Sequence, residues 1–424
     1  MAKPIRAVAL VAVASLGLAA CGGSSSSGSS SSGGGGGGKT LIISTDLPLQ
    51  GPSKDASEST NQAIELYLQQ IGNKAGNYTI KLQKYDDSTA AAAKWDSGQC
   101  ATNANAHVKN KDEVAIMGTF NSGCAKIQVP ILDQDPAGPM LMVSHANTNP
   151  GLTKAWDSGE PDKYYPKSAR NYARVVTTDD VQGVAVGTFA SADLKIKKLY
   201  ILNDNETYGQ GVAKAVASEA AKNGITVIAN EAWDPKATNY TALFQKIKAA
   251  GADSVYLAGV FDNNGAQLVK DKTSVLGDNA TIKLLGPDGF SGYPDTLNKM
   301  PEAQGMYLTF PGLSTDQLKA KGGPGAKLLT DYKATYGKDP ASNYALYGVA
   351  AVQVIIEAIK KSDGTRKGVT NAVFGGDGIV IPADVSVLGK EAKIDPKTGD
   401  VDVKDITVEI IKDQKETFLK AVGV

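Results

Sequence analysis

Three loops of this sequence, each directly after a short apolar run, carry side chains that could hold a small charged molecule. They span residues 118–124, 144–150 and 286–289. The first two are rich in hydroxyl and amide groups, which together with helix N-terminal N–H groups suit a carboxylate. The third presents Asp288 between a proline and a glycine, where it could accept hydrogen bonds from an ammonium group. Together the loops would complement a zwitterion, although ordinary polar turns use the same residue types.

The loops need a scaffold, and from Lys39 onward short β-rich runs alternate with longer helical patterns. Strict alternation predicts right-handed crossovers and parallel sheets, which bind ligands beyond the carboxyl ends of their strands. Two such series, before and after Tyr172, predict two α/β lobes. The predicted strands are 40–45, 80–85, 114–117, 140–143, 198–202, 226–230, 254–258 and 283–285. The predicted helices are 59–71, 100–109, 125–133, 181–192, 209–223, 240–250 and 265–271.

The tail departs from this alternation. It contains two predicted helices, 324–336 and 343–361, and two β runs, 379–381 and 406–411. We expect these elements to be shared between the lobes.

The N-terminus has the pattern of an export signal. Lys3 and Arg6 precede an apolar stretch, and residues 18–21 read Leu-Ala-Ala-Cys, which resembles the bacterial lipobox. Residues 1–21 are therefore predicted to be a lipoprotein signal peptide with Cys21 as the lipidated residue. An ordinary transmembrane anchor is the alternative, but the apolar stretch is short of the roughly 20 residues a span requires. Residues 22–38 are only glycine and serine, which predicts a tether.

Composition limits the function classes. Lysine plus arginine equals aspartate plus glutamate at 44 each, so no field for nucleic acid is indicated. Once Cys21 is assigned to lipid, Cys100 and Cys124 remain as an even pair in an oxidising compartment, which favours a disulfide over two buried thiols. No metal site and no cofactor are predicted, because the two cysteines lack partners at ligand spacing.

Several short motifs resemble the leucine/isoleucine/valine-binding proteins that serve ABC transporters. They occur in family order over the chain from Lys39 to its end. They are the segments 84–87, 118–124, 144–153, 179–183, 203–211 and 286–289. The resemblance implies the type I periplasmic-binding fold, with two Rossmann-like lobes joined by a three-strand hinge. It places lobe one at 39–176 and 310–402, and lobe two at 177–309 and 403–424.

The same resemblance implies roles for individual residues. Ser122 matches the serine that holds the ligand carboxylate, and Ala146-Asn147-Thr148 matches a second carboxylate-binding segment whose first carbonyl meets the ammonium. Asp288 matches the acidic partner of the ammonium, and Tyr208 matches a tyrosine that precedes a Gly-x-Gly segment. A family disulfide joins positions that match Cys100 and Cys124.

The sequence also departs from the family pattern. The Gly51-Pro52 loop lacks the aromatic residue usual before the first helix, Val260 replaces a frequent tyrosine, and His145 stands where proline is common. We interpret His145 as a pocket-lining or packing residue, and residues 270–272 as a solvated helix end. These departures concern the pocket for the ligand's side chain.

The predicted function is an extracytoplasmic receptor, lipid-anchored to the bacterial cell membrane, that delivers a branched-chain or other small amino acid to ABC permease subunits. A monomer is expected. A receptor for amides or aromatic and organic acids on the same fold is the alternative. An enzyme is not expected, because the sequence contains no zinc-protease, nucleophile-elbow or phosphate-loop motif.

Overall fold

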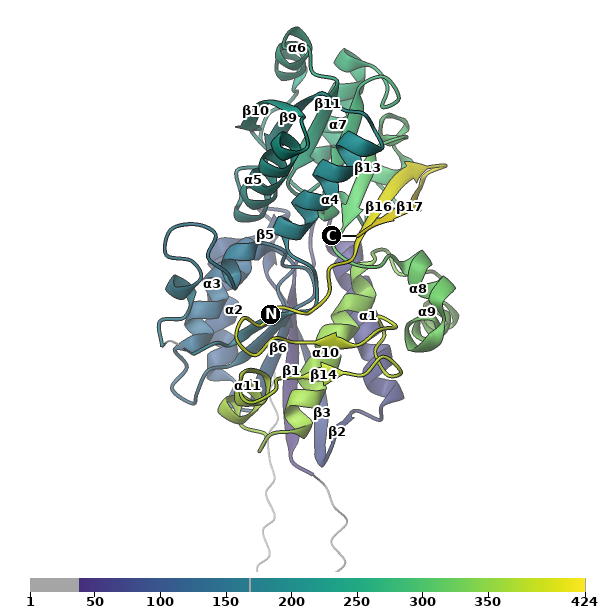
Figure 1. The fold of residues 1–424 in the computed structure, drawn as a ribbon. Coiled ribbons are helices and arrows are strands. Elements are labelled where there is room, and N and C mark those ends of the chain that lie inside the picture. The colour runs from purple at the N-terminus through teal and green to yellow at the C-terminus, as the bar shows by residue number, and fades with distance from the viewer. Residues whose placement is uncertain (1–37, 168, 424) are drawn as a thin grey trace, which may run out of the picture. The chain divides into compact units, whose positions relative to one another are not determined.

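The computed structural model describes residues 38–167 and 169–423. The predicted signal peptide, Cys21 and the tether up to residue 37 lie outside the described residues. From Gly38 onward the chain packs as one unit with two large β-sheets. We call each sheet with its helices a lobe (Figure 1). None of the described helices combines the length and the apolar character needed to cross a bilayer.

The first lobe is built on a six-stranded sheet with the order β2-β3-β1-β6-β7-β8. Neighbouring strands pair in parallel, except for β2 and β3. The strands β1 and β6 are almost wholly buried, which is typical of central strands covered on both faces. The strands are β1 Thr40–Leu47, β2 Lys74–Ala75, β3 Tyr78–Asp86, β6 Glu113–Gly118, β7 Leu141–Ser144 and β8 Tyr172–Arg174.

In the described part of the chain, seven helices pack around this sheet. The helix α10 lies in the core against α1, β6 and β7, and 15 of its 17 residues are buried. A helix that is apolar all round is a buried helix, so α10 is part of the hydrophobic core of the first lobe. The helices are α1 Lys54–Gln70, α2 Ser97–Lys109, α3 Ser122–Asp133, α8 Thr315–Lys321, α9 Gly323–Tyr336, α10 Tyr344–Lys360 and α11 Arg366–Phe374.

The second lobe is built on a seven-stranded sheet with the order β10-β9-β11-β12-β13-β16-β17. Its strands are β9 Lys198–Asn203, β10 Thr226–Ala232, β11 Ser254–Ala258, β12 Lys283–Gly286, β13 Tyr307–Phe310, β16 Ile406–Lys412 and β17 Lys415–Val422. The associated helices are α4 Asp179–Ala192, α5 Thr207–Lys222, α6 Thr241–Ala249 and α7 Gly265–Leu276. Two short ribbons complete the strands: β4 Ser88–Thr89 with β5 Lys94–Trp95, and β14 Val380–Ile381 with β15 Ala392–Lys393.

Strict alternation predicted sheets that are parallel throughout. The observed sheets are parallel at their centres but have antiparallel pairs at their edges. The strand β16 pairs antiparallel with both β13 and β17. Asp413 and Gln414, both in the left-handed backbone region, form the tight connection of the β16–β17 hairpin. The tail is shared between the lobes as expected, because α8–α11 pack in the first lobe and β16 joins the second sheet.

One predicted helix begins earlier than expected, and several elements were not predicted. The helix α1 begins at Lys54 rather than Ser59, because its first turn is polar and shows no apolar period. The strand β17 was not predicted. It lies at a sheet edge and is mostly exposed, so its sequence lacks the apolar pattern of a buried strand. The other elements without a prediction are β2, β4, β5, β8, β13, α8, α11 and β15.

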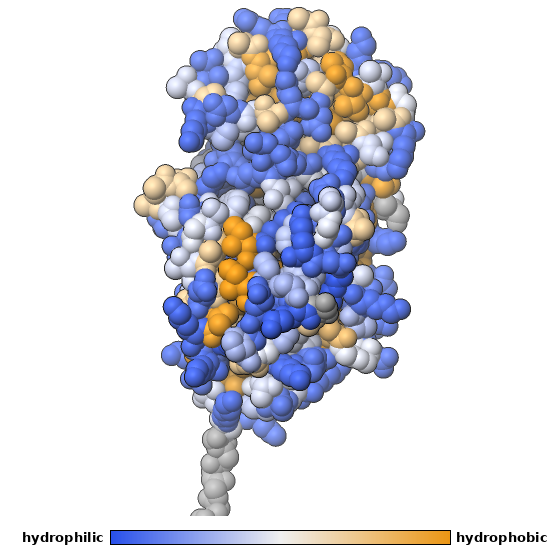
Figure 2. Space-filling view, turned by 90° about the vertical axis from the view of Figure 1, so that its left-hand side faces the viewer, coloured by the Kyte–Doolittle hydropathy of each residue, from blue (hydrophilic) through white to orange (hydrophobic). Residues whose placement is uncertain are grey.

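The outer surface fits a chain of balanced charge. The face in Figure 2 is largely hydrophilic, with smaller apolar areas over both lobes. Among the described residues the exposed large apolar side chains are Val385, Phe418 and Leu419. Such scattered exposure is ordinary for a folded domain.

Candidate ligand-binding site

The three loops singled out in the sequence meet where the lobes face each other. The first two leave β6 and β7 in the first lobe, and the third leaves β12 in the second. Together with α5 they enclose a small cavity of about 10 Å³, room for about one water-sized sphere. The lobes are therefore nearly closed upon each other in this structure. The lining residues are Phe120, Asn121, Ser122, Ala146, Tyr208, Val260, Asp288 and Gly289.

Ser122 lies on the first-lobe side of the cavity as the first residue of α3. Its side chain is buried, and its only hydrogen bond within the described residues is a long one, 3.5 Å from the backbone nitrogen of Asn149 to its Oγ. Asn121, the residue before the helix, makes no side-chain capping bond. An uncapped helix N-terminus with a nearby hydroxyl offers the partial positive charge and the hydrogen-bond donors that suit an anion.

Asp288 lies on the second-lobe side, four per cent exposed. Its Oδ1 accepts hydrogen bonds from Gln182 and Tyr208, both at 2.8 Å, and its Oδ2 accepts one at 2.7 Å from Tyr344. Burial raises the pKa of Asp288, although these three donors lower it in part. Gly289 is required next to it, because a Cβ there would meet the carbonyl of Gly259 at 2.3 Å.

A second buried acid, Asp179, accompanies Asp288. The amide of Gln182 bridges the two, since its Nε2 lies 3.2 Å from Asp179 Oδ1 and 2.8 Å from Asp288 Oδ1. Burial and the neighbouring Asp288 raise the pKa of Asp179 well above its usual value. Within residues 38–167 and 169–423, neither carboxylate has a salt-bridge partner, and Asp179 Oδ2 has no hydrogen-bond partner. A cation entering here would offset the cost of burying both charges.

Two predicted site residues do not line the cavity. Asn147 donates from Nδ2 to the carbonyls of Thr119 and Phe120, both at 2.9 Å, and accepts from Tyr172 at 3.1 Å. It therefore joins the loop after β7 to the loop after β6. Thr148 is fully buried, and its hydroxyl has no hydrogen-bond partner among the described residues. Ala146, by contrast, does line the cavity.

An aromatic cluster backs the first-lobe wall. The rings of Phe120, His145 and Tyr344 lie 5.6 to 6.0 Å apart between centroids. Burial lowers the pKa of His145 to about 3, so this imidazole is neutral near pH 7. His145 is thus a packing residue behind the cavity, one of the two roles expected from the sequence.

Further contacts join the lobes outside the cavity, and we call them the latch contacts. The side chain of Asp262 accepts from the backbone nitrogen of Ser53 at 3.1 Å and from its hydroxyl at 2.7 Å. Trp95 Nε1 donates to Glu206 at 2.9 Å, and Lys94 forms a salt bridge with the same carboxylate. These contacts hold the first lobe's loops against the second lobe without involving the cavity.

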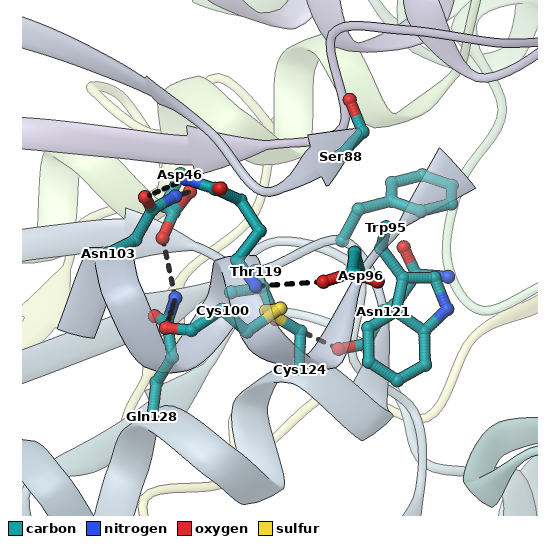
Figure 3. The surroundings of a disulfide bond; sticks show 12 residues. Asp46, Ser88, Trp95, Asp96, Cys100, Asn103, Thr119, Asn121, Cys124 and Gln128 are labelled. Atoms are coloured by element: carbon teal, nitrogen blue, oxygen red, sulfur yellow. Dashed lines mark hydrogen bonds between the residues drawn. A yellow bond between two sulfur atoms is a disulfide. The ribbon is translucent and has the colours of Figure 1, made fainter. Parts of the chain in front are cut away.

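A buried polar network lies behind the loop after β6. His107 is fully buried between Asp46 and Glu113, with its nitrogens 3.3 and 2.7 Å from their carboxylate oxygens. Burial lowers the pKa of His107, but the hydrogen bonds and charges of both carboxylates outweigh it and raise the pKa to about 9. The disulfide between Cys100 and Cys124 is present and joins α2 to the first turn of α3 (Figure 3). Both features support the helix that begins at Ser122.

Some residues of the site escaped the sequence analysis. Tyr344 reads as the start of an apolar helix, and only the folded chain brings it to Asp288. Asp179 and Gln182 were quoted as part of a family motif without a site role. Their place in that motif was the one signal that could have identified them.

Comparisons with known proteins agree with this architecture. The family model described as periplasmic binding protein matches residues 46–382. An amino acid binding protein of Pseudomonas aeruginosa is 26% identical over 336 residues, covering 78% of each chain. The Leu/Ile/Val-binding protein BraC3 of Rhizobium johnstonii is 27% identical over 340 residues, 80% of this chain and 84% of that protein.

Solved structures share the fold. The leucine-binding protein LivK of Thermotoga maritima superposes with a TM-score of 0.73 at 20% identity, covering 90% of this chain and 98% of that one. A solute-binding protein of an ABC transporter from Rhodopseudomonas palustris, in complex with p-hydroxybenzoic acid, superposes with a TM-score of 0.74 at 16% identity. The superposition covers 91% of this chain and 97% of that one. With the family model covering most of the sequence, the chain belongs to the periplasmic binding protein family, whose members are extracytoplasmic solute receptors rather than enzymes.

Proposed function

We propose that this protein captures a small amino acid between its lobes and delivers it to an ABC importer. The pair of buried acids, Asp179 and Asp288, carries the proposal, because neither has a cationic partner within the described residues. An ammonium group would supply one positive charge to this pair. Ser122 and the N-terminus of α3 provide for the carboxylate on the opposite side of the cavity.

The names of the relatives support an aliphatic amino acid as ligand. One relative is described as binding leucine, isoleucine, valine, threonine and alanine, and is 25% identical over 325 residues. Phe120 and Val260 form apolar walls of the cavity, which suits an aliphatic side chain. The lobes would open to admit the ligand and close on it, since only contacts to both lobes favour the closed form.

An aromatic acid is the second candidate ligand, because a similar structure holds p-hydroxybenzoic acid. That likeness concerns the fold. A hydroxybenzoate has a carboxylate for Ser122 but no cation for Asp288, so it would leave the acid pair uncompensated. We therefore favour the zwitterion.

We further propose the location and organisation of the mature protein. Cys21 would carry lipid, residues 22–38 would tether the folded part to the membrane, and ABC permease subunits would be the partners. The chain would cross from one lobe to the other near Val176, Thr309 and Val403. These crossings lie between β8 and α4, at the end of β13, and before β16. These three segments would form the hinge.

A ligand panel with four members tests the proposed recognition. Calorimetry would compare an aliphatic amino acid, the amine without its carboxylate, the acid without its amine, and p-hydroxybenzoate. The zwitterion should bind most tightly, and Asp288→Asn should abolish its binding at a cost of roughly 3 to 5 kcal/mol. Asp384→Asn, at an exposed first-lobe acid, is the control. Equal affinity of wild type and Asp288→Asn would refute the role of Asp288.

A further inference from the structure

An unpaired acid lies beside the disulfide. Asp87 directly follows β3 and is fully buried, and neither of its carboxylate oxygens has a hydrogen-bond partner among the described residues. A carboxylate oxygen of Asp87 and the sulfurs of Cys100 and Cys124 all lie within 4.8 Å of one another. Figure 3 shows the two sulfurs between Asp46 and Gln128 on one side and Asp96 on the other.

The neighbouring polar groups do not serve Asp87. Asp46 takes its own hydrogen bonds, from Asn103 at 2.8 Å, from Gln128 at 2.5 Å and from His107. Burial, then the charge of Asp46, raises the pKa of Asp87 well above its usual value. With the disulfide formed, Asp87 is thus a buried carboxyl group whose neutral form is favoured and whose oxygens have no partner in the described structure, which is costly for a buried polar group.

We propose that the reduced form of this protein binds a thiophilic divalent cation such as Zn²⁺ through Cys100, Cys124 and Asp87. Two sulfurs and one carboxylate oxygen are a donor set that Zn²⁺ accepts, with water completing four-coordination. Zn–S bonds of about 2.3 Å and Zn–O bonds of about 2.0 to 2.2 Å require donors as close as these three are. Spacing along the sequence could not reveal this set, because Asp87 reaches the cysteines only through the end of β3.

The reaction needs a reductant, which is a small dithiol. The dithiol gives two electrons and two protons, so that the Cys100–Cys124 bond breaks, two thiols form, and the reductant's own sulfurs join in a disulfide. The cation then displaces the two thiol protons and the carboxyl proton into solution. Its charge offsets the charges of the thiolates and favours the ionised form of Asp87.

The experiment uses the full chain with Cys21→Ser, so that Cys100 and Cys124 are the only thiols of a protein with three cysteines. The protein is reduced with a dithiol without oxygen, freed of reductant, and titrated with Co²⁺ by absorbance and with Zn²⁺ by calorimetry. One equivalent should bind with thiolate-to-cobalt absorption, and the oxidised protein should bind none. Asp87→Asn should weaken binding at least about tenfold, and the control Asp384→Asn should not change it.

Circular dichroism shows whether a loss of cation binding reflects a lost ligand or an unfolded chain. The reduced chain should keep its folded spectrum, and Asp87→Asn should be folded with its disulfide intact. The proposal is overturned if the folded reduced protein binds no cation, or if Asp87→Asn binds it as tightly as the parent. A reduced chain that is unfolded with and without the cation overturns it as well.

Discussion

The hydroxyl of Tyr344, the first residue of α10, donates a 2.7 Å hydrogen bond to Oδ2 of Asp288 on the opposite lobe. The acid that we assign to the ligand's ammonium is thereby oriented by both lobes. The second lobe contributes Tyr208 and Gln182, and the first contributes Tyr344. Closure of the lobes thus completes the polar surroundings of Asp288.

Tyr344→Phe should weaken ligand binding by about 1.5 to 3 kcal/mol, because it removes a hydrogen bond to a charged group that forms only on closure. Calorimetry measures the affinity, and small-angle scattering measures the closing of the lobes. Tyr336→Phe is the control, because the half-buried Tyr336 of α9 donates to the carbonyl of Gln62 within the first lobe, and neither residue lines the cavity. Unchanged affinity in Tyr344→Phe would show that the cross-lobe bond is not part of the bound state.

Ser122→Ala should weaken carboxylate ligands by about 1.5 to 3 kcal/mol, because a charge-assisted hydrogen bond is lost. An amine without a carboxylate should bind the variant and the wild type alike. Ser158→Ala, at an exposed position, serves as the control. If the carboxylate and the bare amine lose the same free energy, Ser122 does not contact the carboxylate.

Affinity for a zwitterion should fall as the pH is lowered, and the fall should begin above the usual titration range of an aspartate. The pKa of Asp288 is raised by burial, so the carboxylate takes up its proton at a higher pH than an exposed aspartate and loses its attraction for an ammonium. His145 does not contribute, since its pKa of about 3 keeps it neutral near pH 7. Calorimetry at several pH values measures the effect. A flat profile in the wild type would contradict an ionised Asp288 as the ammonium partner.

Stability should depend on pH through His107. Its pKa is about 9 in the folded chain and 6.5 for an unpaired histidine, so the folded state holds this proton more tightly. The resulting stabilisation is complete below pH 6.5 and is lost as the pH rises through 9. The wild type should therefore lose about 3 kcal/mol relative to His107→Gln between about pH 6 and pH 10. Urea unfolding at both pH values measures this, and a constant difference would be the contrary result.

Lipid anchoring should depend on Cys21. The wild type expressed in a bacterial host should partition into the detergent phase of a phase-separating detergent, because acyl chains contribute about 0.8 kcal/mol per buried methylene. Cys21→Ser should move to the aqueous phase. Detergent partition of Cys21→Ser equal to that of the wild type would refute the assignment.

The sequence predicted the framework of the fold well and the contacts between distant segments poorly. The strand β11 was predicted with its observed bounds, because a buried β-branched and aromatic run between turns is a local signal. Asp288 was found from a four-residue turn. Tyr344 and Asp179 were not identified from the sequence. They lie 56 and 109 residues from Asp288 along the chain, and only the packing of the folded chain brings them near it.

Lys272 illustrates a wrong prediction. It was interpreted as part of a solvated helix end, but its side chain is fully buried. Its ammonium donates to the carbonyls of Gly277, Asp278 and Ile282 and to Asn279 Oδ1 at 2.6 to 3.1 Å. A lysine can be buried when such acceptors replace its water. The sequence alone does not show that these carbonyls will lie around one ammonium group.

Arg366, the first residue of α11, is buried and donates to backbone carbonyls of His107, Val108, Asn110 and Glu113. One late side chain thus secures a stretch synthesised some 250 residues before it. These four carbonyls therefore gain their partner only after residue 366 has been synthesised. A chain whose late residues complete its early contacts folds late. Late folding suits a polypeptide that has to pass unfolded through a narrow translocation channel.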